Sequence, residues 1–354
     1  MNSGQDLSTE LREHVLQAAA EDKRLELLGG GTKRFYGHPT TGVPLEISGH
    51  RGVVTYEPKE LVMTVRAGTP LAWVEQALAS EGQMLPFEPP HLGDRATVGG
   101  TLACGISGPR RPFTGAVRDF VLGARIINGR GDILRFGGEV MKNVAGYDTA
   151  RLMAGSLGTL GVVLDVSFKV LPLPERELTL SRECSQPQAL AEMNRLAGRP
   201  LPLSGACYDG RRLHIRLSGS SLAVAAGKNH IGGDEGHSQQ LWQDLRELSL
   251  PFFNSPQPLW RLSVPASAPP LECTDKQFLD WGGAQRWLVS QAPPESIRTM
   301  VEKLGGHATL FRGGTRNQRI FHPLSQPLMI LHQRLKQAFD PKGLFNSGRL
   351  FPEL

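Results

Sequence analysis

Apolar residues recur with helical spacing at two places near the start of the chain. Leu7, Leu11 and Val15 follow one another at four-residue intervals and so share one face of a predicted helix. A second apolar face with helical spacing follows Thr69, which can cap a helix, and it ends near Gly82, a residue typical of helix ends. We therefore predict two amphipathic helices in this part of the chain.

Other segments have the short apolar runs, bounded by turn residues, that are typical of strands. They lie at 25–28, 53–56, 61–65, 121–127, 133–136 and 162–171. Beyond residue 175 glycine becomes less frequent, and strand patterns alternate with helical patterns, the last of which covers 323–339. This change predicts a domain boundary near residue 175 in a chain of the α+β class. No internal repeat is evident in the sequence.

Glycine is unusually frequent, with 41 of the 354 residues, against about 7% in average proteins. It gathers in three loops, 29–31, 99–108 and 155–161. Three successive glycines lose much backbone entropy on folding, so the triplet at 29–31 needs a physical reason. Two reasons stay open for it: a tight turn between strands, or a nest of main-chain N–H groups that binds a phosphate.

Together the three loops suit a large, extended ligand that contains phosphate, such as a dinucleotide. Two common nucleotide motifs are absent from the sequence. The chain has no Gly-x-Gly-x-x-Gly run that opens a helix, and it has no Gly-x-x-x-x-Gly-Lys-Ser/Thr run. The ligand, if it is a dinucleotide, is therefore expected to bind by another arrangement of glycines.

Composition excludes several classes of function. The net charge is +5, without a block of like charge, which does not predict a nucleic-acid partner. The four cysteines lack the spacing of zinc or iron–sulfur ligands, so we expect no metal and free thiols in a reducing compartment. The N-terminus is polar and no apolar run has the length of a membrane span, so we expect a cytoplasmic protein without a transmembrane segment.

An ordered set of short motifs resembles a known family. The motifs are Gly29-Gly-Gly-Thr32, Leu61-Val-Met-Thr-Val-Arg-Ala-Gly68, Thr97-Val-Gly-Gly100, Gly115-Ala-Val-Arg-Asp119, Lys142-Asn-Val-Ala-Gly-Tyr-Asp148, Gly155-Ser-Leu-Gly-Thr-Leu-Gly161 and the tail Phe339-Asp-Pro-Lys-Gly-Leu-Phe-Asn-Ser-Gly-Arg349. In this order they resemble the FAD-binding domain of the vanillyl-alcohol oxidase / p-cresol methylhydroxylase (PCMH-type) family. The resemblance covers about half of the chain.

The resemblance implies a two-part PCMH-type FAD-binding domain at 1–174 and a smaller α+β cap-like domain at 175–330. A C-terminal helix and tail, 331–354, would return to the FAD domain. Some members of the family attach FAD through a His just after the first glycine loop, whereas Thr32 and Lys33 stand at that place here. The resemblance therefore implies FAD that is bound without a covalent bond.

The same resemblance implies which residues bind FAD. The pyrophosphate would lie on Gly29, Gly30, Gly31, Thr32 and Lys33. A side chain introduced at Gly30 is therefore expected to occupy the place of the pyrophosphate. The diphosphate and ribityl chain would follow Thr97, Gly99, Gly100 and Gly105. The adenine end and the nearby flavin edge would lie on Gly158, Gly161 and Val162. Asn346 and Arg349 would return from the tail toward the isoalloxazine ring.

The length of the chain and the residue pattern of its second half are similar to those of the smaller FAD-binding subunits of bacterial glycolate oxidases. That implies a 2-hydroxy-acid substrate and electron transfer through the flavin to partner subunits, namely a larger homologous flavoprotein and an iron–sulfur subunit, with membrane association only through such partners. The His-rich metal and substrate segment of the larger hydroxy-acid dehydrogenases is absent. The alternative is a non-catalytic, FAD-carrying or structural subunit that supports the larger chain.

Candidate catalytic residues lie in the densest basic group of the second half. Arg316 is a candidate to hold the substrate carboxylate, and His322 is a candidate base for its hydroxyl proton. The alternative for this group is a solvated basic loop or a partner contact, because Arg and Lys are ordinarily exposed.

Overall fold

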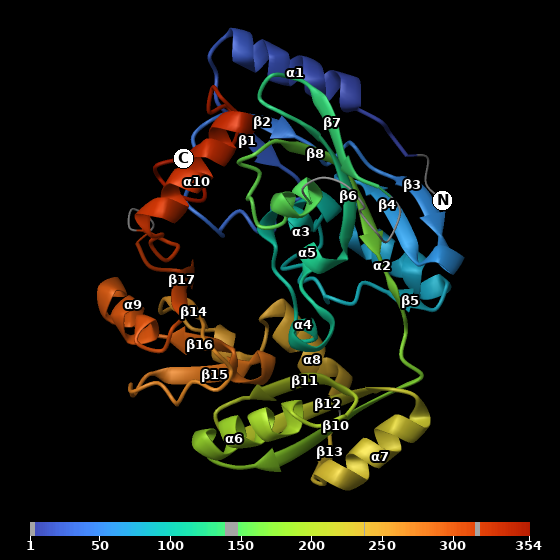
Figure 1. Ribbon diagram of the computed structural model, residues 1–354, viewed down its shortest axis with the longest axis vertical. Coiled ribbons are helices and arrows are strands. Elements are labelled where there is room, and N and C mark those ends of the chain that lie inside the picture. Colours follow the sequence, from blue (N-terminus) through green and yellow to red (C-terminus); the bar gives the residue numbers. More distant parts are fainter. Residues whose placement is uncertain (1–3, 139–147, 237, 316–318) are drawn as a thin grey trace. The chain divides into compact units, whose positions relative to one another are not determined.

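The computed structural model describes residues 4–138, 148–236, 238–315 and 319–354 (Figure 1). The chain forms two compact units, each built from separate stretches of sequence. The first unit contains Met1–Ile106, Ala116–Leu173 and Pro323–Leu354, and the second contains Ser107–Gly115 and Pro174–His322. Relative to the expected boundaries at 174/175 and 330/331, the second unit gains a piece of the glycine-rich region, and the returning segment begins at 323.

The first unit is organised around a five-stranded antiparallel sheet with the order β3-β4-β8-β6-β7. Its strands are β3 (Val53–Glu57), β4 (Val62–Arg66), β6 (Val121–Ile127), β7 (Ile133–Gly137) and β8 (Val162–Lys169). The central strand β8 is buried along almost its whole length, which explains its near-continuous apolar sequence. A parallel pair, β1 (Leu25–Leu28) and β2 (Val43–Glu46), lies outside this sheet and leads directly into the glycine triplet.

Helices and short elements complete the first unit. They are α1 (Ser8–Ala20), η1 (Pro58–Glu60), α2 (Leu71–Ser80), β5 (Gln83–Met84), α3 (Val98–Cys104), α5 (Val117–Phe120), η2 (Thr149–Met153), β9 (Leu171–Pro172) and α10 (Gln326–Phe339). The apolar faces of α1 and α2 are buried in one core with the sheet, as their spacing predicts. The expected cap of α2 is wrong, because the Thr69 hydroxyl accepts the amide hydrogen of Gly52 at 2.8 Å and is unavailable to the helix.

The second unit contains an eight-stranded sheet with the order β13-β10-β12-β11-β15-β16-β14-β17. Its first half is formed by β10 (Arg176–Glu183), α6 (Gln186–Ala197), β11 (Leu203–Tyr208), β12 (Arg212–Gly219), α7 (Ser221–Ile231) and β13 (Asp234–Glu235). Its second half is formed by β14 (Leu259–Ser263), β15 (Lys276–Asp280), β16 (Gln285–Val289), α9 (Pro294–Glu302) and β17 (His307–Arg312). The remaining elements are α4 (Arg111–Thr114), α8 (Ser238–Glu247), η3 (Pro251–Phe253) and η4 (Trp281–Gly283).

The two halves of this sheet repeat one arrangement. In each half the second and third strands form a hairpin, the first strand pairs with the third, and the fourth pairs with the first. The halves join edge to edge where Tyr208 of β11 pairs with Leu279 of β15. The second unit is therefore an internal structural repeat, which the sequence does not reveal.

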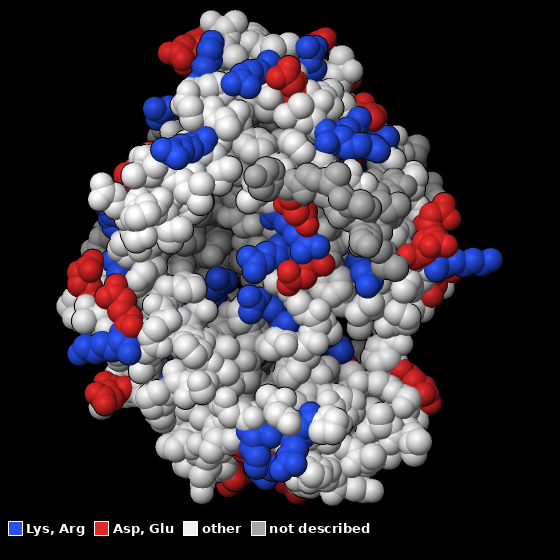
Figure 2. Space-filling view, in the orientation of Figure 1, with Lys and Arg blue, Asp and Glu red and all other residues white. Residues whose placement is uncertain are grey.

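The surface in Figure 2 carries basic and acidic side chains interspersed over the same face. Among the described residues, each helix is either too short or too polar to cross a membrane.

The turn between β11 and β12 contains a carboxylate that is sensitive to acid. Burial alone would raise the pKa of Asp209, but hydrogen bonds from His214 and from the amides of Arg211 and Arg212 outweigh it and hold the pKa at about 2. His214 is in turn bound to Ser181 of β10 at 2.8 Å, so the carboxylate fixes the turn to the sheet.

This geometry predicts how stability depends on pH. The folded pKa of Asp209 lies below the unfolded value of about 3.9, so its contribution is present above pH ~4 and is lost as pH falls toward 2. We expect Asp209→Asn to reduce the slope of unfolding free energy against pH in this window. Urea unfolding followed by circular dichroism at several pH values measures the slope, and identical slopes for both proteins would contradict the assignment.

Candidate functional site

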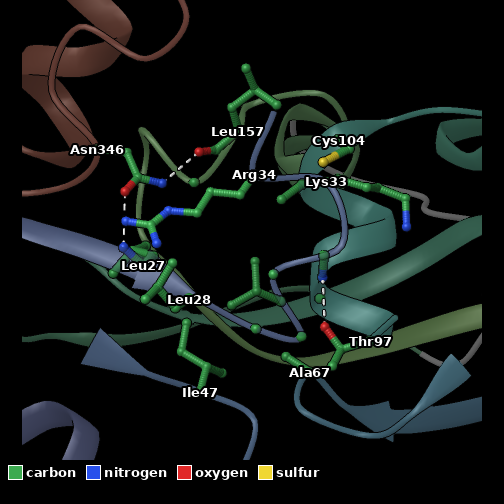
Figure 3. A pocket seen from close by; sticks show the side chains of 18 of the residues that line it. Leu27, Leu28, Lys33, Arg34, Ile47, Ala67, Thr97, Cys104, Leu157 and Asn346 are labelled. Atoms are coloured by element: carbon green, nitrogen blue, oxygen red, sulfur yellow. Dashed lines mark hydrogen bonds between the residues drawn. The ribbon is translucent and has the colours of Figure 1, made fainter. Parts of the chain in front are cut away.

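A pocket that is partly open to solvent lies in the first unit beside the glycine triplet (Figure 3). Four segments build most of it: the end of β1 with the triplet, the start of α3, the loop before β8, and the C-terminal tail. Ile47 after β2 and Ala67 after β4 complete the lining. The lining residues are Leu27, Leu28, Gly29, Gly30, Gly31, Thr32, Lys33, Arg34, Ile47, Ala67, Thr97, Gly99, Gly100, Ala103, Cys104, Leu157, Gly158, Gly161, Val163, Asn346 and Arg349. All of the expected FAD-binding residues except Gly105 and Val162 are therefore brought together.

Main-chain geometry explains the glycine triplet. A Cβ atom on Gly30 would lie 1.4 Å from the carbonyl oxygen of Arg95, so this α-carbon is packed against protein backbone. The expectation that a side chain at Gly30 would fill the ligand's place is therefore wrong, since that side chain would first collide with the loop at Arg95. Gly31 is different: its φ is +73°, and its nearest neighbour for a Cβ is Arg95 Nη2 at 4.0 Å.

The amides of this loop are available to a ligand. Those of Gly30, Gly31 and Thr32 donate no hydrogen bond to any other residue that the structure describes. Successive unpaired N–H groups at a left-handed turn form a nest that attracts anions. This arrangement favours the phosphate-binding alternative for the triplet over a simple turn.

The start of α3 forms the facing wall. Thr97 caps the helix, because its hydroxyl accepts the amide hydrogen of Gly100 at 3.3 Å. A Cβ on Gly99 would lie 2.7 Å from the Cβ of Ala67, and a Cβ on Gly29 would lie 2.5 Å from the Thr97 hydroxyl. These glycines let the helix, β1 and the Ala67 turn approach one another, and they leave a wall made of small residues.

Positive side chains surround the pocket. The buried Lys33 ammonium donates to the carbonyl of His91 at 3.0 Å, and Arg34 forms a two-bond ion pair with the buried Glu26 at 3.0 and 2.8 Å. Arg349 is buried as well and donates to the carbonyl of Tyr36 at 3.3 Å. Burial lowers the pKa of Arg349, although its ordinary value is high enough that the group stays cationic. Three cationic side chains, those of Lys33, Arg34 and Arg349, thus stand against the carboxylate of Glu26, which favours an anionic ligand.

Cys104 also lines the pocket, beside Lys33 in Figure 3. Burial raises the pKa of its thiol, and the charges of Lys33 and Arg349 offset this only in part. A thiol with a raised pKa stays protonated and is a weak nucleophile.

The C-terminal tail ties the walls together. Asn346 lies between Leu27 and Leu157 in Figure 3: its side-chain oxygen accepts from the Leu27 amide at 2.9 Å, and its Nδ2 donates to the Leu157 carbonyl at 2.7 Å. A Cβ on Gly158 would lie 2.8 Å from Asn346 Nδ2, so this position needs a glycine. One side chain thus fixes the distance between β1 and the loop before β8.

A buried ion pair positions this tail. The Lys336 ammonium, near the end of α10, contacts Asp340 at 2.7 Å and also donates to the carbonyls of Thr159 at 2.8 Å and Phe345 at 2.9 Å. Asp340 in turn accepts the amide hydrogens of Leu344 and Phe345. The pair therefore joins the helix, the tail and the loop before β8 directly next to Asn346.

Two expected binding residues lie just outside the pocket for local reasons. Val162 points into the apolar core, while its neighbour Val163 lines the pocket, because successive side chains of a strand face opposite sides. Gly105 ends α3 with a φ of +63°, and a Cβ there would lie 2.9 Å from Gly155. Each is one position away from a residue that lines the pocket.

Neither expected catalytic residue is among the described residues that line this pocket. Arg316, like most of the motif 142–148, lies outside the described residues. His322 lies in the second unit, where its Nδ1 accepts from the Ala308 amide at 3.3 Å and its Nε2 is 3.1 Å from the Glu302 carboxylate. These contacts are of the kind a structural histidine makes, and the role as a base stays a prediction.

The sequence did not identify several lining residues. Arg34 directly follows Lys33, so a second basic residue at the loop was a usable signal. Leu27, Leu28, Ile47, Ala67, Ala103, Leu157 and Val163 carry no chemical signal, because apolar residues beside a ligand and in a core look alike in a sequence.

Comparison with known proteins agrees with this geometry. A family model described as "FAD binding domain" matches residues 8–137. The Escherichia coli (strain K12) protein "Glycolate oxidase subunit GlcE" is 52% identical over 349 residues, which are 99% of either chain. "Glycolate oxidase subunit GlcD" of Bacillus subtilis (strain 168) is 35% identical over 154 residues, which are 43% of this chain and 33% of that protein.

The fold has a counterpart among solved structures. A structure of alkyldihydroxyacetonephosphate synthase superposes with a TM-score of 0.67 over 96% of this chain and 74% of that one, at 16% sequence identity. The predicted α+β class with a PCMH-type FAD-binding domain is therefore confirmed. The chain belongs to the family of the glycolate oxidase subunit GlcE, whose members have a PCMH-type FAD-binding domain.

Proposed function

We propose that this chain is the FAD-binding subunit of a multi-subunit 2-hydroxy-acid oxidoreductase, with glycolate as the expected substrate. The observation that carries the proposal is the pocket beside Gly29–Gly31, where unpaired amides and cations meet walls of small residues. The relatives supply the substrate class, since GlcE and GlcD are both named as glycolate oxidase subunits. When bound, FAD supplies a two-electron acceptor for oxidation of an alcohol.

The residues of the pocket fit the parts of FAD. In this proposal the amides of Gly30, Gly31 and Thr32 hold the pyrophosphate, and Lys33, Arg34 and Arg349 balance its charge. Gly99 packs against Ala67 and Gly158 packs against Asn346, so these glycines bring the walls of the pocket close together. Binding is non-covalent: the Thr32 hydroxyl is bound to the His91 carbonyl at 2.8 Å, and the raised pKa of Cys104 keeps that thiol protonated.

Partners complete the enzyme in this proposal. Electrons leave through a larger homologous flavoprotein and an iron–sulfur subunit, and substrate oxidation requires these chains. The sequence supports this division, because it lacks the His-rich metal and substrate segment of the larger hydroxy-acid dehydrogenases. The alternative is that FAD here is structural and the larger chain alone performs the chemistry.

The proposal is tested on the isolated chain and on the co-expressed complex. We expect the isolated chain to be yellow, to release its flavin on acid precipitation, and to keep that flavin oxidised when glycolate is added. The flavin should bleach in the complex. A colourless chain that cannot be reconstituted with FAD would refute the proposal, and rapid bleaching of the isolated chain would refute the need for partners.

A glycine substitution separates ligand binding from backbone strain. Gly31 and Gly82 have similar φ values, +73° and +66°, and a Cβ at Gly82 meets nothing within 4 Å. Valine at either place costs about 1–2 kcal/mol of conformational energy, but only Gly31→Val places a side chain at the pocket. We expect at least a tenfold rise in the FAD Kd for Gly31→Val and none for Gly82→Val, measured by flavin fluorescence. Equal affinities would mean that the triplet is only a turn.

The co-expressed complex tests the alternative that FAD in this subunit is structural. If a complex that carries Gly31→Val has lost the flavin of this subunit but oxidises glycolate at the full rate, FAD here is structural. We expect instead that the rate falls in proportion to the flavin lost.

The buried pair behind the pocket yields a third test. Lys336→Met leaves the Asp340 carboxylate buried without its counter-charge, which typically costs about 3–5 kcal/mol, and frees the Thr159 and Phe345 carbonyls. We expect a loss of unfolding free energy of that size and weaker FAD binding, since Asn346 follows Phe345. Urea unfolding and FAD titration measure both effects. The exposed Lys342→Met is the control, and an unchanged FAD Kd in Lys336→Met would contradict the positioning role.

A further inference from the structure

The two repeats of the second unit are covered in different ways. In the first repeat α6 and α7 both pack on β12 and its neighbours. Helix α6 contributes Ala189, Leu190, Met193 and Leu196 to a core that also contains Leu213, Ile215 and Leu217 of β12. An amphipathic helix thus occupies the chain position between the first two strands of this repeat (Figure 1).

The second repeat lacks a helix at that position. The segment 264–275, all of it described by the structure, connects β14 to β15 without forming a helix. It contains Pro265, Pro269 and Pro270, which disfavour a helix interior. The buried Arg286 guanidinium of β16 holds the segment in place by donating to the carbonyls of Ala268 and Pro269, both at 2.5 Å.

A groove remains between this segment and α9. It encloses about 1410 Å³ of space that is open to solvent. Leu288 of β16 and Ile297 of α9 are buried at its base, and Cys273, Met300 and Leu304 are half-buried along its sides. We call this the α9 groove. Leu288 lies on β16, the counterpart of β12, and the segment 264–275 packs beside it with Ala268 and Leu271 buried in the same core.

The rim of the α9 groove is mainly acidic. Glu272, Asp275 and Glu295 line it, with Lys303 as the single basic residue among the lining residues that the structure describes. Glu272 and Glu295 are exposed, and Arg298 pairs with Glu295 at 2.8 Å from the buried face of α9. Arg298 compensates Glu295, so the negative charge of Glu272 and Asp275 is what complements an occupant that carries Lys or Arg beside its apolar face.

We propose that the α9 groove receives an amphipathic helix of a partner subunit, with basic residues flanking its apolar face. The incoming helix would lie between the segment 264–275 and α9, with its basic residues toward Glu272 and Asp275. Its apolar residues would recur with helical spacing, so that one face contacts Met300 and Leu304. That the partner is another subunit of the same enzyme rests on the proposed function.

A native cysteine reports directly on this groove. Cys273 lines it, whereas Cys184 is also half-buried but lies with the core of the first repeat. Alkylation of each thiol is followed by peptide mass spectrometry in the isolated chain and in the complex co-expressed with the larger flavoprotein and iron–sulfur subunits. We expect Cys273 to react at least tenfold more slowly in the complex and Cys184 to react at the same rate in both.

Charged substitutions test the same contact by affinity. Met300→Glu and Leu304→Glu should each prevent co-purification of the partners. The matched control is Leu222→Glu on α7, whose leucine is 82% exposed and lies outside the groove. FAD content of each isolated variant shows that the first unit is intact. Charge reversal at Glu272→Lys should weaken the complex more at low than at high ionic strength.

The outcomes separate the two proposals. A complex that forms with Cys273 unprotected and tolerates Met300→Glu would overturn the α9 groove as the docking site while leaving the proposed function in place. Protection of Cys273 in the isolated chain at high concentration, with a doubled mass, would show that a second copy is the occupant and would overturn the choice of partner. Failure of the three chains to form any complex would overturn both proposals.

Discussion

The pocket depends on one buried ion pair that is not part of it. Lys336 and Asp340 lie one turn apart at the end of α10, and together they saturate their polar atoms with main-chain groups from the tail and the loop before β8. A buried charge without such partners is strongly destabilising, so both side chains can be buried only when these segments are in place. Asn346 then connects β1 to the same loop. The spacing between β1 and the loop before β8 is thus set by a contact far along the chain.

Much of the first unit could be predicted because its signals are local. Apolar spacing located α1, α2 and the strands, and the ordered glycine motifs led to the pocket that the structure forms. The tail residues Asn346 and Arg349 reach that pocket as the family resemblance implied. Their long-range contacts could not be derived from spacing alone, because nothing local indicates that residue 346 meets residues 27 and 157.

The errors have physical causes that a single sequence does not show. The Thr69 hydroxyl accepts a hydrogen bond from the Gly52 amide instead of capping the helix that follows it, because a tertiary contact competes with the cap. Val162 and Val163 are chemically identical, and only strand pairing decides which one faces the pocket. Gly30 is required because of the Arg95 carbonyl rather than a ligand. The internal repeat escaped notice because the amphipathic helix α6 in one half corresponds to a proline-rich segment held by Arg286 in the other.

The distribution of the first unit along the chain has a consequence for its biosynthesis. A ribosome releases the second unit, Pro174–His322, before it has made the segment that contains Lys336, Asp340, Asn346 and Arg349. Domains generally fold in the order in which they are synthesised. The wall contacts at Leu27 and Leu157 must therefore wait for residue 346, and the pocket is complete only in a chain whose translation has passed that point.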